Sequence, residues 1–149
     1  MELIFRETQP GDIQSLFRVR ARTRENALSQ EYLASLGITA ESIRANMESG
    51  RVIGRVCLHE SEVVGFCNGD SETGEVLVLA VLPNYEGKGI GRRLLLNVVE
   101  QLRSLGCGMI WLCASADSRI RAHGFYRSLG WRQTGERFEN GDEMLMLES

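Results

Sequence analysis

One segment limits the fold of this chain more than any other, because it joins an apolar run to a glycine-rich turn and a helix start. The run begins at Leu77 and ends at Pro83, and glycines then occupy alternate positions at Gly87, Gly89 and Gly91. Apolar residues follow at the spacing of one helix face, at Leu94, Leu95, Val98, Val99 and Leu102. The pattern predicts a strand, a tight turn and an amphipathic helix.

A turn of this kind builds an anion-binding site. The first N–H groups of a helix have no partner within the helix, and the helix dipole adds partial positive charge at the same end. Glycine lets the backbone approach a phosphate closely, and Lys88, Arg92 and Arg93 add cationic side chains. The segment therefore predicts a phosphate-bearing ligand, and a glycine-rich turn without a ligand remains the alternative.

Two common phosphate motifs do not match this segment. A P-loop needs Gly-Lys followed by Ser or Thr, whereas Lys88 is followed by Gly89. A dinucleotide fingerprint needs two residues between its second and third glycines, whereas Ile90 alone separates Gly89 from Gly91.

The segment instead resembles the pyrophosphate loop of the GNAT family of acetyl-CoA-dependent N-acetyltransferases. That loop has Gln or Arg, then two residues, Gly, one residue, and Gly or Ala; the match fails only at the first position, which is Glu86. The resemblance implies that acetyl-CoA is the co-substrate and that it lies against this loop. The implied cofactor-binding residues of the loop are Glu86, Gly87, Lys88, Gly89, Ile90, Gly91 and Arg92.

A second stretch, residues 121–131, resembles the family's Ala-x-x-Phe-Tyr-x-x-x-Gly-Trp segment and follows at the expected distance. It has helical spacing, a glycine typical of a helix stop and a tryptophan that opens a new strand. The matching residues are Ala122, Phe125, Tyr126, Gly130 and Trp131. Two motifs in the family's order make the resemblance specific over residues 75–131.

The order of elements agrees with the same fold. Strands are expected at residues 2–7, 51–59, 62–69, 75–82, 109–113, 131–138 and 143–147, with helices at 13–20, 39–50, 89–105 and 118–129. The resemblance implies an α/β (α+β) GNAT fold, with a central mixed, mostly antiparallel sheet of about seven strands flanked by about four helices. In the family the fourth and fifth strands splay apart, so a cofactor cleft is expected between them.

Composition and net charge argue against several classes of function. The 149 residues are expected to form a single domain, 1–149, and a net charge of −3 argues against nucleic acid as a partner. Four cysteines without C-x-x-C spacing argue against structural zinc, so no metal is expected. Without a signal peptide or a run long enough to span a bilayer, the chain is expected to be cytoplasmic, with no membrane partner.

The resemblance also assigns chemical roles. Leu79 and Val81 would offer backbone groups to the pantetheine arm, and the Val81 N–H would stabilise charge on the acetyl oxygen. Ser118 stands where many family members have an asparagine that touches the same arm. Tyr126 would act as general acid, since a phenol keeps its proton at neutral pH; packing beside Phe125 is the alternative.

The general base and the acceptor are less defined. Glu75 occupies the position of the catalytic glutamate in the histone-acetylating branch, and a strand-start role or a water chain are the alternatives. An arginine-rich stretch, residues 18–24, falls where the family forms one wall of the acceptor site, and Arg22 and Asn26 are predicted to bind substrate. A guanidinium there favours an amino-acid-like acceptor, whereas a solvated arginine face would carry no such meaning.

The sequence thus predicts direct acetyl transfer from acetyl-CoA to a primary amine of a small molecule. Two alternatives stay open: a protein lysine or N-terminal acetyltransferase, and a non-catalytic acyl-CoA-binding sensor. The exposed edge of the closing strands is compatible with a homodimer.

Overall fold

The computed structural model describes residues 1–25 and 27–147. Its elements follow in the order β1 Ile4–Glu7, α1 Ile13–Arg20, α2 Gln30–Ser35, α3 Ala40–Glu48, β2 Val52–His59, β3 Glu62–Asp70, β4 Val76–Val81, α4 Ile90–Ser104, β5 Ile110–Ser115, α5 Arg121–Ser128, β6 Trp131–Arg137 and β7 Asp142–Leu147. Short 3₁₀ turns at Pro10–Asp12 and Pro83–Tyr85 lie before α1 and α4.

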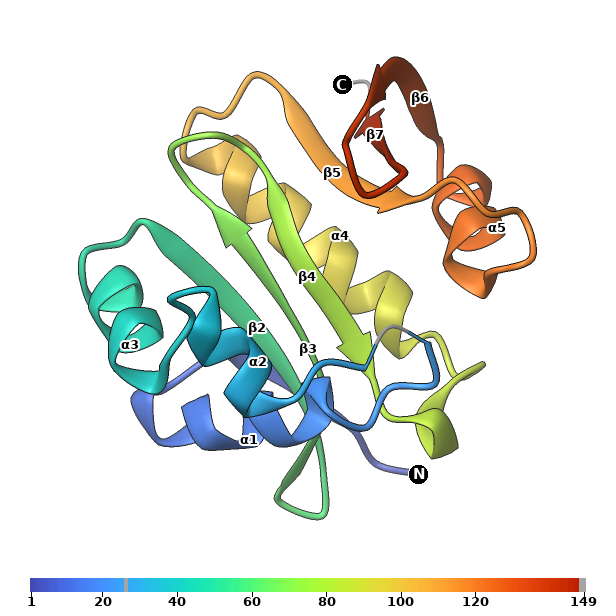
Figure 1. Ribbon diagram of the computed structural model, residues 1–149. Coiled ribbons are helices and arrows are strands. Elements are labelled where there is room, and N and C mark those ends of the chain that lie inside the picture. Colours follow the sequence, from blue (N-terminus) through green and yellow to red (C-terminus); the bar gives the residue numbers. More distant parts are fainter. Residues whose placement is uncertain (26, 148–149) are drawn as a thin grey trace.

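The seven predicted strands are present, and they divide into two sheets (Figure 1). One sheet has the order β1-β2-β3-β4 and the other β5-β7-β6, and neighbouring strands in both run antiparallel. A parallel bridge between Glu75 and Trp111 connects them. The predicted splay of the fourth and fifth strands is therefore confirmed, and it separates what the sequence suggested as one central sheet.

Helices cover both faces of the larger sheet, as Figure 1 shows for α4 on one side and α1 and α3 on the other. The apolar stripe of α4 is the centre of the main core, where Leu94, Val98 and Leu102 are fully buried. On the opposite face, Leu16 and Val19 of α1 pack in a second cluster against β2, β3 and β4. The sheet that carries β4 is thus fixed from both sides.

The sequence missed one helix and misplaced the start of another. The missed helix is α2, where the Ser29 hydroxyl accepts a hydrogen bond from the Tyr32 N–H and Leu33 is buried. Its six residues are too few for a helical spacing of apolar residues to be recognised in the sequence. Helix α5 begins at Arg121 rather than near Ser118, because the side chain of Asp117 accepts hydrogen bonds from the N–H and guanidinium of Arg119 in a preceding turn.

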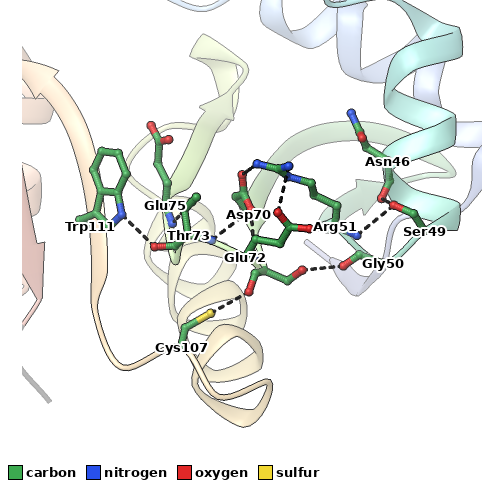
Figure 2. Close-up of polar contacts among 11 residues, drawn as sticks. Asn46, Ser49, Gly50, Arg51, Asp70, Glu72, Thr73, Glu75, Cys107 and Trp111 are labelled. Carbon is green, nitrogen blue, oxygen red and sulfur yellow. Dashed lines mark hydrogen bonds and ion pairs between the residues drawn. The ribbon is translucent and has the colours of Figure 1, made fainter.

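The two sheets meet at the turn between β3 and β4, which Figure 2 shows with its polar contacts. The Trp111 N–H donates to Gly74 O at 3.2 Å, and the Trp111 indole N–H donates to Thr73 O at 3.0 Å. On the other side of the turn, Arg51 forms ion pairs with Asp70 and with Glu72 (Figure 2). The Trp111 contacts close one end of the gap between β4 and β5, and the Arg51 ion pairs join the turn to the start of β2.

Gly74 is required at this junction, and replacing it by alanine should lower the free energy of unfolding by about 2–4 kcal/mol. Its φ is +79°, and a Cβ atom there would lie 2.0 Å from Met109 O. Gly106→Ala is the matched control, because Gly106 also has a positive φ, +95°, but a Cβ there meets nothing within 4 Å. Urea unfolding should show a loss of only about 1 kcal/mol for this control; equal losses in both variants would contradict the role of the Met109 contact.

Candidate active site

A cleft opens where β4 and β5 diverge from the Glu75–Trp111 bridge. Its volume is about 730 Å³. Its walls come from β4, β5, the glycine loop, the start of α4, α5, the loop after α1 and the β6–β7 turn. The space is of the size that organic ligands occupy in proteins.

The edge of β4 presents free backbone groups to this cleft. The Leu82 N–H donates to Val64 O across the sheet at 2.9 Å. Because successive N–H groups of a strand point to opposite sides, those of Leu79 and Val81 point away from β3 and toward the gap. Both residues line the cleft, in the places where the sequence predicted backbone contacts to the pantetheine arm.

The glycine loop turns into α4 through two left-handed residues. Gly87 has φ +76°, and Gly89, at the N-cap of α4, has φ +80°. A Cβ atom at either position would meet no protein atom within 4 Å, so this surface of the loop is open. The unpaired N–H groups at the start of α4 therefore lie at a bare backbone surface on the cleft wall, as an anion site requires.

The three cations of the loop have different positions. Arg92 lines the cleft, whereas Lys88 is exposed and does not line it. The Arg93 guanidinium lies over the Phe5 ring, 4.2 Å from its centroid, on the strand β1. Of the three side chains, the geometry places only that of Arg92 beside a ligand in the cleft.

Glu86 lines the cleft, but its carboxylate already has two partners. It accepts hydrogen bonds from the Arg24 Nε, at 3.1 and 3.2 Å, and from a guanidinium nitrogen of Arg121. The predicted contact between Glu86 and the cofactor is thus replaced in this geometry by contacts with arginines from two other segments. The sequence could not show these pairs, because the partners lie 62 and 35 positions away.

Tyr126 lies on α5 and lines the cleft. Its ring packs edge-on against Phe125 and Trp131, with centroid separations of 5.3 and 6.0 Å. Burial raises the pKa of the Tyr126 phenol well above its usual value. Within the described part of the chain its hydroxyl has no hydrogen-bond partner, so the proton is held and remains available to a ligand.

Glu75 lies at the bridge to Trp111 from which the cleft opens, and it does not itself line the cleft. The Cys113 thiol, which lines the cleft, donates to a Glu75 carboxylate oxygen at 3.8 Å. Burial raises the pKa of Glu75 above its ordinary value, and burial together with the Glu75 charge raises the pKa of Cys113 to about 11. The thiol therefore stays protonated at neutral pH and is a poor nucleophile, whereas Glu75 is a partly desolvated base.

Of Arg20 and Arg22, it is Arg20 that lines the cleft. Arg22 lies with Arg18 in a separate hollow on the outer side of α1, with a volume of about 370 Å³. Arg20 lines the cleft, and burial lowers its pKa. Its position follows from helical spacing, since it comes four residues after the buried Leu16; the prediction for Asn26 falls outside the described residues.

Three further cleft residues were not found from the sequence. Ser115, at the end of β5, lines the cleft, whereas the predicted Ser118 is exposed in the next turn. Asn140 and Asp142, at the β6–β7 turn, lie on the cleft wall as well. No local pattern signals them, because their place depends on how the smaller sheet packs beside the larger one.

Comparisons with known proteins point to one family. Residues 12–131 match the model of the acetyltransferase (GNAT) family. The chain is 29% identical over 127 residues to the uncharacterized N-acetyltransferase YjhQ of Escherichia coli K12, covering 81% of this chain and 68% of that relative. It is 32% identical over 84 residues to glucosamine 6-phosphate N-acetyltransferase of Trypanosoma brucei brucei, covering 56% of this chain and only 53% of the relative.

A solved structure shows the same fold. The PaiA N-acetyltransferase of Thermoplasma acidophilum, in complex with coenzyme A, superimposes with a TM-score of 0.81 at 20% identity, covering 100% of both chains. In residues 1–25 and 27–147, none of the helices has the length and apolarity needed to cross a membrane.

Proposed function

Because this chain belongs to the acetyltransferase (GNAT) family and is therefore an acetyl-CoA-dependent acyltransferase, we propose that it transfers acetyl directly to a primary amine of a small molecule. One observation carries the proposal. A single cleft holds the bare glycine loop at the start of α4, the free edge of β4 and the protonated Tyr126 hydroxyl. These are the groups needed to bind a diphosphate, stabilise a developing oxyanion and protonate a thiolate.

The residues fit acetyl-CoA at two places. The open amides of Gly87, Gly89 and the first turn of α4 suit its diphosphate, with Arg92 as a charged neighbour. The free backbone groups of Leu79 and Val81 suit the amide-bearing pantetheine arm. When bound, acetyl-CoA supplies the acetyl group and a thiolate leaving group.

We assign the chemical steps to three groups of the chain. The Val81 N–H hydrogen-bonds the carbonyl oxygen as negative charge develops on it. The Tyr126 hydroxyl donates its proton to the departing sulfur, since its raised pKa keeps it protonated throughout the working range. Glu75 accepts the proton of the attacking amine through water, because its carboxylate lies at the edge of the cleft rather than in its lining.

This role of Glu75 gives a pH dependence. A general base works in its charged form, so kcat/KM should rise as pH increases through a pKa above the ordinary glutamate value, because burial raises that of Glu75. Glu75→Gln should remove this acidic limb and lower kcat/KM by about 10²- to 10⁴-fold. A pH–rate profile of the variant that keeps the limb would assign it to the acceptor amine and remove Glu75 from the mechanism.

The acceptor end of the cleft carries both signs of charge. Arg20 lines it on the α1 side, and Asp142 lies on the opposite wall. A small amine that also bears a carboxylate or phosphate would match a guanidinium and a carboxylate together. The relative named for glucosamine 6-phosphate, an amine with an anionic group, supports this acceptor class.

Release of free thiol from acetyl-CoA, measured across amino acids, amino sugar phosphates, polyamines and lysine or N-terminal peptides, tests the proposal. Turnover with a small anionic amine is the expected result. Turnover confined to peptides would establish a protein acetyltransferase instead, and CoA binding without turnover on any amine would favour a sensor. A cytoplasmic location, a single domain and a homodimer stay predictions.

A further inference from the structure

Four charged residues from three segments join at the rim of the cleft. Arg24 and Glu25 belong to the loop after α1, Glu86 begins the glycine loop, and Arg121 begins α5. Glu86 pairs with both arginines, and Glu25 accepts a hydrogen bond from the Arg121 N–H at 3.2 Å. We call these four residues the Glu86 cluster.

Exposure within the Glu86 cluster is uneven. The Glu86 side chain is 18% exposed, whereas those of Arg24 and Arg121 are 61% and 52% exposed. Ion pairs with such exposed partners contribute little to stability, because water and salt screen them. Fold stability is therefore a weak reason for this arrangement.

Both guanidinium groups keep donors for another anion. Arg24 uses only its Nε toward Glu86, and Arg121 uses one terminal nitrogen. In the part of the chain that the structure describes, the two terminal nitrogens of Arg24 and the other side-chain nitrogens of Arg121 make no hydrogen bond. Each group can thus hold Glu86 on one edge and an incoming oxygen on the other.

The ion pairs of the Glu86 cluster offset the charge of the Glu86 carboxylate. A carboxylate immediately before the glycine loop would repel a diphosphate if it stood alone. Paired with Arg24 and Arg121, it belongs to a group of three residues with a net charge of +1, which Glu25 brings to zero for the whole cluster. The Glu25 carboxylate accepts a hydrogen bond from the backbone N–H of Arg121 at the start of α5, so it joins the cluster through Arg121.

We propose that Arg24 and Arg121 bind the diphosphate of CoA, and that Glu86 is a positioning residue that holds both guanidinium groups beside the glycine loop. The proposal rests on the function proposed above, since it needs CoA in this cleft. The cations come from the loop after α1 and from α5, outside the glycine motif. A glutamate at the first position of that motif then serves as their common anchor.

The arginines can be tested with a ligand that lacks phosphate. Arg24→Gln and Arg121→Gln should each weaken CoA binding by about 5- to 20-fold in calorimetry and flatten its dependence on NaCl concentration. Binding of S-acetylpantetheine, which has no diphosphate, should stay within about twofold of wild type. Arg44→Gln, an exposed residue of α3, is the control for the same change in net charge.

Wild-type CoA affinity and salt dependence in both arginine variants would overturn the proposal, as would equal losses for CoA and S-acetylpantetheine. A wild-type protein that binds no CoA would instead overturn the proposed function. The two failures are therefore distinguishable.

Substitution of Glu86 gives a second test, because its expected effect on CoA binding changes sign between two backgrounds. Glu86→Gln alone should weaken CoA binding by about 2- to 5-fold, because the guanidinium groups lose their anchor. In a chain that already carries Arg24→Gln and Arg121→Gln, the same change should strengthen binding, because it removes an unpaired carboxylate next to the diphosphate. An effect of the same sign in both backgrounds would contradict the positioning role.

Discussion

Tyr126→Phe should lower kcat by about 10- to 10⁴-fold while leaving CoA affinity within about twofold of wild type. The substitution removes only the hydroxyl, and the ring keeps its packing against Phe125 and Trp131. Because the Tyr126 hydroxyl has no partner in the described residues, no buried acceptor is left unsatisfied and stability should change little. The loss should therefore appear in the chemical step alone.

Kinetics and calorimetry on the same preparations separate these effects. Tyr32→Phe is the matched control, since Tyr32 is an exposed tyrosine of α2 outside the cleft. The wild-type rate should also show no alkaline decline from Tyr126 up to about pH 10, because burial raises its pKa. Wild-type kcat in Tyr126→Phe would remove the residue from the mechanism and leave it a packing role.

Gly89→Asp should weaken CoA binding by about 10- to 100-fold. A Cβ atom there would meet no protein atom within 4 Å, so we expect the aspartate side chain to project from the loop into the space proposed for the diphosphate. Its carboxylate would then oppose the phosphates at a helix N-terminus that otherwise attracts them. An effect of this size is expected only if the part of the ligand beside residue 89 is anionic.

Gly89→Asn separates charge from backbone strain. Gly89 has φ +80°, a conformation that Asn and Asp both tolerate better than other residues with side chains. The two variants are nearly equal in size, so the difference in their CoA dissociation constants measures the charge. Equal weakening by both variants would contradict the phosphate-loop assignment, and so would wild-type affinity in Gly89→Asp.

Local sequence patterns were sufficient to predict the main elements that form the site. The stripe from Leu94 to Leu102 predicts α4, because one helix face must be buried against the sheet. Alternate glycines before that stripe predict a tight turn, in which the structure gives Gly87 and Gly89 positive φ. Tyr126 was found through its motif, and it does line the cleft. Each of these signals lies within about one helix or turn of the residue concerned.

Contacts between side chains that are far apart in the sequence could not be predicted from local patterns. The partners of Glu86 come from the loop after α1 and from α5, and their meeting depends on tertiary packing. Asp142 reaches the cleft only because the smaller sheet diverges beside β4. Arg20 differs from these residues, since helical spacing from the buried Leu16 is a local signal that places it on the inward side of α1.

Calorimetric titration of CoA into the wild-type chain, repeated with Gly89→Asp, tests most directly whether the β4–β5 cleft is an acetyl-CoA site. The expected result is saturable binding with one CoA per chain that weakens as NaCl is added and falls by at least about tenfold in the variant. A wild-type chain that binds no CoA, or a variant that binds it equally well, would contradict the assignment of the glycine loop and the site built on it.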